Sequence, residues 1–161
     1  MNKIIQISPQ FAVTGALAPG DLAAAAKGGF RSVISNLPDG ELASSPVSTH
    51  EGEVAQRAGL GFCHVPVAKG EIAWARMAEQ MLEALRRLPP PVLAHCASGQ
   101  RSALAWAAAA AACHPVDDVL GALSAAGFNA YPLREELAGL AGLGASGPIP
   151  AALGLQPPRP V

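Results

Sequence analysis

The segment that decides the fold begins at Val92 and reads Val92-Leu93-Ala94-His95-Cys96-Ala97-Ser98-Gly99-Gln100-Arg101-Ser102-Ala103. Its first four residues, apolar apart from His95, predict a short buried strand. A cysteine then opens a loop that contains a glycine, and Arg101 leads into a helix rich in alanine. In an open α/β sheet, ligands bind at the carboxyl ends of the strands, so this order of strand, loop and helix predicts the position of an active site.

The residue types in this loop favour nucleophilic chemistry on an anionic substrate. Backbone N–H groups of a tight loop above a helix N-terminus form an anion-binding cradle, and Arg101 can add a two-pronged contact to a tetrahedral oxyanion. The same positive field favours the thiolate form of Cys96, which is the reactive form of a cysteine nucleophile. We therefore predict that Cys96 and Arg101 are catalytic. The other expected members of this anion-binding loop, residues 96–102, are Ala97, Ser98, Gly99, Gln100 and Ser102.

Around this segment, the chain alternates short apolar runs with helical patterns. We expect strands at residues 4–7, 11–13, 32–35, 62–67 and 92–95, and helices at residues 19–27, 49–58, 71–88, 102–113, 116–126 and about 132–143. This alternation predicts an α/β fold with a mostly parallel central sheet flanked by helices, followed by a helical C-terminal part. The length of 161 residues fits a single domain, expected over residues 1–145. Residues 146–161 include five prolines and are expected to form an extended or mobile tail.

Composition and charge narrow the functional classes. Hydrophobic residues make up 50% of the chain and charged residues only 14%, which excludes an intrinsically disordered chain. The formal net charge of −1 leaves no basic surplus for binding nucleic acid or an anionic membrane surface. The most apolar stretch, residues 103–113, is too short to span a membrane, and the N-terminus has no apolar region typical of an export signal. We therefore expect a cytoplasmic location.

The three cysteines predict free thiols rather than a disulfide framework or a metal site. Cys63, Cys96 and Cys113 are an odd number and have no Cys-x-x-Cys spacing. If residues 102–113 are helical, Cys113 lies about 17 Å along the helix axis from the loop. Cys63 is expected about 13 Å below the loop. We therefore expect both to be core thiols, and we expect no metal and no other cofactor.

The His-Cys and Arg-Ser pairs, placed between a strand and a helix, resemble the signature of the cysteine-based protein tyrosine phosphatases. The order of strands and helices also fits a protein tyrosine phosphatase-like fold. Those enzymes place five residues between the cysteine and the arginine, whereas this chain has four, from Ala97 to Gln100. Four is the active-loop length of many single-domain rhodaneses, so the segment resembles two classes of enzyme at once.

A closer resemblance covers the chain from Ile4 to about Gly127. It rests on residues 33–41 (VISNLPDGE), 64–67 (HVPV) and 91–102 (PVLAHCASGQRS). These segments are similar to the β-lactamase-hydrolase-like, phosphatase-like domain family. The resemblance implies a phosphatase-like fold and, in part, rhodanese activity. It also implies a sulfide-oxidising partner enzyme, because the family occurs fused to such enzymes.

One departure from that family concerns the general acid. Such domains often carry an acidic residue soon after the Pro-Val pair, whereas here residues 68–70 intervene before Glu71. Glu71 is the nearby candidate, although an acid in the first turn of the helix at 71–88 would equally stabilise the N-terminus of that helix. Cleaving a phosphate ester usually needs a proton from a placed acid, whereas sulfite leaves thiosulfate without one.

The short loop and the displaced acid favour sulfur transfer as the main interpretation. Cys96 would take the outer sulfur of a thiosulfate-like donor as a persulfide and pass it to a small thiol or to cyanide. In the alternative, a cysteine-based phosphatase of the tyrosine or dual-specificity type, Cys96 attacks phosphorus and forms a phosphoenzyme. A third, non-enzymatic interpretation is a persulfide-carrying or anion-sensing module.

Two further residues have candidate supporting roles. His95 is expected to orient the loop through a hydrogen bond, or simply to pack at the end of its strand. Asp39 follows a neighbouring strand and could face the site, although an Asp-Gly turn explains it equally well.

Overall fold

A five-stranded sheet forms the centre of the computed structural model, which describes residues 1–157. The strands lie in the order β1-β2-β5-β3-β4. β1 pairs with β2 in an antiparallel hairpin, whereas the other pairs are parallel. The strands are β1 (Ile5–Ser8), β2 (Phe11–Thr14), β3 (Ser32–Ser35), β4 (Gly61–His64) and β5 (Val92–His95).

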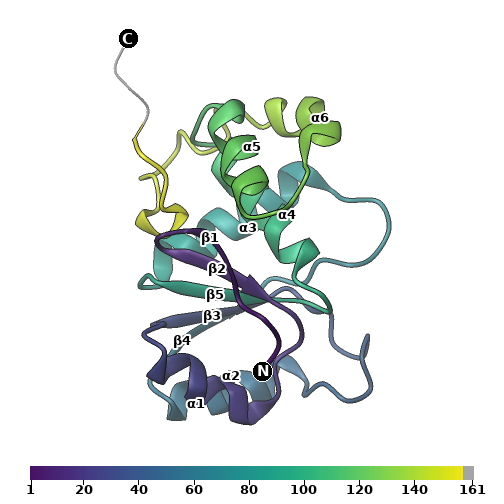
Figure 1. Cartoon of the computed structure of the whole chain (residues 1–161), viewed down its shortest axis with the longest axis vertical. Helices are drawn as coiled ribbons and strands as arrows, with labels where there is room; N and C mark the ends of the chain where they lie inside the picture. Colours follow the sequence, from purple (N-terminus) through teal and green to yellow (C-terminus); the bar gives the residue numbers. More distant parts are fainter. Residues whose placement is uncertain (158–161) are drawn as a thin grey trace.

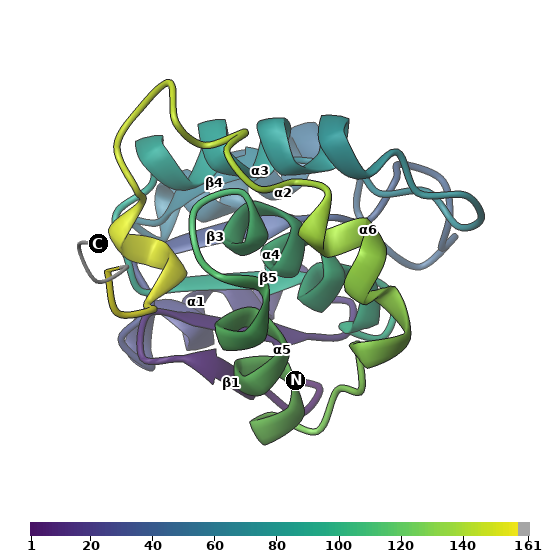
Figure 2. The same ribbon diagram turned by 90° about the horizontal axis from the view of Figure 1, so that it is seen from above.

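Helices cover both faces of this sheet (Figure 1). One face carries α1 (Pro19–Lys27) and α2 (Ser48–Arg57), and the other carries α3 (Trp74–Arg87), α4 (Gln100–Ala111), α5 (Val116–Ala125) and α6 (Arg134–Ala138). Figure 2 shows α3, α4 and α5 side by side across that second face. The expected mostly parallel α/β architecture with a helical C-terminal part is therefore confirmed. None of the helices within residues 1–157 is long and apolar enough to cross a membrane.

The central residues of β2, β3 and β5 are apolar because their side chains alternate between two helical layers. Phe11 and Val13 join the core under α3 and α4, whereas Ala12 joins the core against α1 and α2. In β3, Ile34 joins the core under α3 and α4, and Val33 joins the core against α1 and α2. A parallel strand that is covered on both faces has no polar side, which explains the continuous apolar runs in the sequence.

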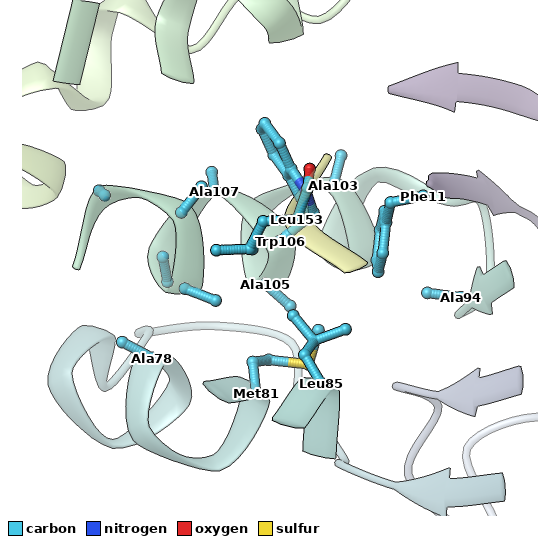
Figure 3. Close-up of a cluster of buried hydrophobic side chains, with 14 of the residues drawn as sticks. Phe11, Ala78, Met81, Leu85, Ala94, Ala103, Ala105, Trp106, Ala107 and Leu153 are labelled. Carbon is cyan, nitrogen blue, oxygen red and sulfur yellow. The ribbon is translucent and has the colours of Figure 1, made fainter. Parts of the chain in front are cut away.

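The alanine-rich helix α4 packs against α3 in the larger core. The alanines among residues 103–112 are at most 3% exposed, and such small side chains let two helices approach closely. Trp106 is the large residue of this helix. Its ring is fully buried beside Phe11, with the two ring centroids 6.3 Å apart (Figure 3).

Part of the predicted tail, residues 150–155, packs onto this core rather than extending away from it. A short 3-10 helix, η2 (Ala151–Leu153), buries Ala152 and Leu153. The indole N–H of Trp106 donates to the backbone oxygen of Leu153 at 3.2 Å. This apolar burial outweighs the tendency of the prolines toward an extended chain. Residues 158–161 lie outside the described residues, and the domain boundary at residue 145 stays a prediction.

Three elements are shorter than their sequence patterns predicted. α3 begins at Trp74 rather than near residue 71, because Gly70 has a φ of +103° and Ala73 is not helical. β4 ends at His64, although the N–H of Val65 still bonds to β3. The last predicted helix divides into η1 (Tyr131–Leu133) and α6, which is followed by Gly139 and turns.

The parallel register brings the carboxyl ends of four strands to one level. Thr14, Ser35, His64 and His95 are the last residues of β2, β3, β4 and β5, and they are aligned across the sheet. The loops after these strands therefore gather at one edge, together with the start of α4 (Figure 1). This edge is where an open α/β sheet binds its ligand.

Candidate active site

The anion-binding loop joins β5 to α4 at this edge, as predicted. Cys96 directly follows β5, and the backbone N–H of Gly99 donates to its Sγ at 3.1 Å. Gly99 is the N-cap residue of α4, so the sulfur lies at the positive end of that helix. Cys96 is completely buried. A substrate or reagent therefore reaches the sulfur only when part of the loop above it moves.

Gly99 meets two requirements of the loop. Its φ of +91° lies in the left-handed region, which L side chains rarely adopt. A Cβ at this position would also lie 3.3 Å from the backbone oxygen of Thr14, at the end of β2. The loop thus packs closely on β2, and the N–H of Ala16 bonds to the backbone oxygen of Ala97.

Arg101 lies in the first turn of α4, and its guanidinium reaches two other loops. Nη1 donates to Oε1 of Glu41 at 2.9 Å and to the backbone oxygen of Val67 at 2.5 Å. Nη2 donates to Oε2 of Glu41 at 2.5 Å. Because Glu41 follows β3 and Val67 follows β4, Arg101 ties three loops of the site together.

These contacts leave one edge of the Arg101 guanidinium open. Arginine has five N–H donors, of which Glu41 and Val67 engage three. The Nε–H and the second Nη2–H share one edge, and neither forms a hydrogen bond within residues 1–157. Two parallel N–H groups of this kind bind two oxygens of a tetrahedral anion. Glu41 therefore holds Arg101 in one orientation and leaves this edge open.

The charges of the Glu41–Arg101 pair reinforce this geometry. Hydrogen bonding from Arg101 lowers the pKa of Glu41, and the charge of Lys69 adds to this effect. Glu41 in turn raises the pKa of Arg101. A carboxyl group with a lowered pKa contributes stability that is present above its usual range and is lost as the pH falls through the lowered value. The pair is therefore expected to be intact at neutral pH and to open only in acid.

A depression of about 430 Å³, here called the mouth depression, lies over the loop. Ile72 and Leu104 give it an apolar wall, and Lys69 and Arg101 give it positive charge. This combination suits a small substrate with an anionic end and an apolar body. The remaining lining residues are Ala68, Gly70, Ala97, Ser98 and Gln100.

Glu71, the candidate general acid, does not line the mouth depression. It is exposed and lines an adjoining depression of about 290 Å³, which shares Ala68 and Ile72 with the first. It also precedes the first residue of α3 by three positions. The interpretation of Glu71 as an acid in the first turn of its helix is therefore wrong.

Asp39 contacts helix α2 and does not line the mouth depression. Its two carboxylate oxygens accept hydrogen bonds from the N–H of Ser48 at 2.7 Å and from the Oγ–H of Ser48 at 2.9 Å. Ser48 is the first residue of α2, where a backbone N–H has no partner within the helix. These hydrogen bonds lower the pKa of Asp39. Asp39 thus serves as a cap for α2.

His95 and Ser102 flank the loop and are both buried. The Nε2 of His95 lies 2.8 Å from a carboxylate oxygen of Glu51, a buried residue of α2. The Ser102 hydroxyl has no hydrogen-bond partner within residues 1–157, so it can still donate to a thiolate or an anion. Sequence reasoning had assigned no role to Glu41 or Glu51.

The other two cysteines lie away from the loop and pack against the larger core. Burial raises the pKa of the Cys63 thiol and of the Cys113 thiol. Both are therefore poor nucleophiles at neutral pH. Within residues 1–157, no group of three metal-ligating side chains comes together.

This arrangement of sheet, loop and helix is a protein tyrosine phosphatase-like fold, which the chain shares with the solved structures described below. Residues 3–113 match the model of the family described as "Beta-lactamase hydrolase-like protein, phosphatase-like domain". The chain belongs to this family.

Two solved structures illustrate the similarity. A provisionally assigned phosphatase from Neisseria meningitidis is 30% identical, with a TM-score of 0.69 over 85% of this chain and 97% of that one. The active form of Tk-PTP is 20% identical, with a TM-score of 0.61 over 86% of this chain and 95% of that one. The second similarity concerns the fold alone.

The curated relatives are much longer proteins. The β-lactamase hydrolase-like protein of Xylella fastidiosa strain Temecula1 is 33% identical over 105 residues, which are 65% of this chain and 24% of the relative. Its counterpart in Agrobacterium fabrum is 30% identical over 100 residues, which are 62% of this chain and 23% of the relative. The matching residues thus span about a quarter of these relatives.

Proposed function

We propose that the protein is a cysteine-based phosphatase that cleaves phosphate monoesters through a phosphoenzyme on Cys96. The Cys96 thiolate attacks phosphorus, an S–P bond forms, and the ester P–O bond breaks as the leaving oxygen takes a proton from solvent water and departs as the alcohol or phenol. Water then attacks phosphorus, the S–P bond breaks, and phosphate is released with the thiolate restored. The loop amides and Arg101 hold the phosphoryl oxygens throughout.

The observation that carries this proposal is the open edge of Arg101. Glu41 holds the guanidinium in place and leaves the Nε–H and Nη2–H edge free, and Cys96, whose sulfur accepts the N–H of Gly99, is near enough to act electrostatically on Arg101. A transferring phosphoryl group needs such preorganised donors, because most of its transition-state stabilisation is electrostatic. The family and the Neisseria meningitidis relative, both of which carry phosphatase in their descriptions, support the same reaction.

Sulfur transfer, the main interpretation of the sequence, is the second candidate. One observation favours it: four residues between Cys96 and Arg101 close a narrower ring than five, which suits an exposed terminal sulfur. A thiol acceptor and a sulfide-oxidising partner enzyme would be needed only for sulfur transfer and not for the phosphatase reaction. The phosphatase reaction, previously the alternative, has the support of the family and of the relative.

Paired assays of the purified protein separate these reactions. One assay follows an aryl phosphate, and the other follows thiosulfate with a small thiol or cyanide as acceptor. We expect turnover of the aryl phosphate. Turnover of thiosulfate alone would reverse the proposal. A Cys96 persulfide without turnover in either assay would indicate a sulfur-carrying module.

The Glu41 carboxylate is expected to matter for turnover. Glu41→Gln leaves one acceptor oxygen where two now hold Arg101, so the guanidinium loses its fixed orientation. We expect kcat for the aryl phosphate to fall roughly 10-fold, within the range of up to about 10² that misplaced groups can cost. Asp39→Asn is the matched control in the same loop, and it should lower the unfolding temperature while kcat stays unchanged. Equal kcat values for Glu41→Gln and the wild type would show that Glu41 does not position Arg101.

Glu71 is expected to contribute little to the reaction. Its exposed position outside the mouth depression leaves it without contact to the leaving group. Glu71→Gln should therefore keep kcat within a few-fold, whereas loss of a general acid costs about 10²–10⁴-fold. The same assay with Glu79→Gln, another exposed acid nearby, controls for the change in surface charge. A loss of the larger size with the fold intact would identify Glu71 as the acid after a loop movement.

A further inference from the structure

We propose that Glu51 is a positioning residue that acts on Cys96 through His95. Glu51 belongs to α2, outside the anion-binding loop, and its carboxylate reaches the side chain that immediately precedes the nucleophile. The inference rests on the proposed function, because it assigns Glu51 a part in preparing the same loop.

The geometry shows which nitrogen of His95 faces Glu51. The distance between Nε2 and Oε2 of Glu51 is 2.8 Å, and the two side chains are 1% and 4% exposed. In this proposal the Glu51 carboxylate accepts and Nε2 of His95 donates. The hydrogen bond therefore sets both the hydrogen position and the orientation of the imidazole ring.

Burying the Glu51 carboxylate on the apolar face of α2 costs free energy, and a functional role would account for that cost. Val54, Ala55 and Ala58 pack against the smaller core and lie at i+3, i+4 and i+7 from Glu51, so the carboxylate lies on the apolar face of α2. Within residues 1–157, the hydrogen bonds of this carboxylate go to His95 alone. Apolar residues can often replace a buried pair of this kind without loss of stability. We infer that Glu51 serves the site.

His95 passes this constraint to the loop because it is held at two points. Its ring is fixed by Glu51, and its backbone oxygen accepts the N–H of Asn36 at 2.7 Å. Cys96 is the next residue, so the backbone that leads into Cys96 starts from a residue that is held in place. The buried Nδ1 of His95 has no partner within residues 1–157. In the neutral ring it is an acceptor, available to a loop N–H when the loop moves to uncover Cys96.

Two substitutions of Glu51 separate positioning from charge. Glu51→Met keeps the length of the side chain and removes the hydrogen bond, and we expect kcat for an aryl phosphate to fall about 10–100-fold, as for other misplaced catalytic groups. Glu51→Gln keeps an acceptor oxygen for Nε2 and should stay within about 3-fold of the wild type, since the orientation of the ring is retained. Glu53→Gln removes an exposed acid from the same helix and serves as the control.

A second readout does not depend on the reaction. Anionic iodoacetate is drawn to the anion-binding loop whereas neutral iodoacetamide is not, so the ratio of their alkylation rates at Cys96 reports on the loop itself. Accessibility affects both reagents equally and cancels in the ratio. We expect the ratio to fall in Glu51→Met and to be kept in Glu51→Gln. Failure of the protein to cleave aryl phosphates would overturn the proposed function and leave this test of Glu51 intact.

The proposal is overturned if Glu51→Met keeps the wild-type kcat and alkylation ratio. It is also overturned if Glu51→Gln loses as much as Glu51→Met, because charge rather than orientation would then be responsible. Imidazole ¹⁵N spectra of the wild type, with His95 assigned by its substitution, decide the matter if Glu51→Met does not fold. Hydrogen on Nε2 supports the proposal, and a bare Nε2 contradicts it.

Discussion

Cys96→Ser is expected to reduce kcat for an aryl phosphate by at least about 10³-fold, the scale of loss on removing a catalytic nucleophile. A serine hydroxyl in the same place is not ionised at neutral pH, so the positive end of α4 and the N–H of Gly99 have no anion to stabilise. The fold should survive, since serine is close to cysteine in size. Circular dichroism and steady-state kinetics on the same preparation measure both effects.

The matched controls are Cys63→Ser and Cys113→Ser. Both thiols have a pKa raised by burial and pack against the larger core away from the anion-binding loop, so each variant should keep the wild-type kcat. A folded Cys96→Ser variant with normal turnover would remove Cys96 from the mechanism. Loss of turnover in Cys63→Ser alone would show that the nucleophile is Cys63 in β4 and not Cys96.

Arg101→Lys is expected to fold and to lose about 10²–10³-fold in kcat, comparable to the loss of a preorganised oxyanion donor. A lysine ammonium is a single point charge, so it cannot hold Glu41 and Val67 on one edge and a phosphoryl group on another. Arg87→Lys, on the exposed side of α3, is the control and should keep full activity. A near-normal kcat in Arg101→Lys would show that Arg101 only holds the three loops together and has no catalytic role.

The elements that are bounded by proline or glycine, or marked by apolar runs, could be predicted from the sequence. The helix at Pro19–Lys27 was predicted with its observed bounds because a proline starts it and glycines follow it. The strand at Val92–His95 was equally clear, since an apolar run marks a strand that is covered on both faces, and the strand at Ser32–Ser35 follows the glycines that end the helix before it. The anion-binding loop followed from its place between such a strand and an alanine-rich helix.

The partners of the site residues could not be predicted because they depend on tertiary packing. Glu41 and Arg101 are 60 positions apart and meet only because the strand register aligns their loops. Glu51 did leave a signal in the sequence. It lies three and four residues before the apolar Val54 and Ala55, which places an acid on the apolar face of a helix. An acid in that position predicts a buried partner, but the sequence does not indicate which one. The burial of the proline-rich C-terminal segment likewise depends on the indole of Trp106.

The central claim is that Cys96 carries the phosphoryl group between two half-reactions. Rapid acid quench of the wild type during turnover of an aryl phosphate, followed by mass spectrometry of the peptide that contains Cys96, tests it directly. We predict that this peptide gains the mass of one phosphoryl group and that the same peptide from Cys96→Ser does not. A wild-type peptide that stays unmodified with the aryl phosphate but gains one sulfur atom from thiosulfate would contradict the account.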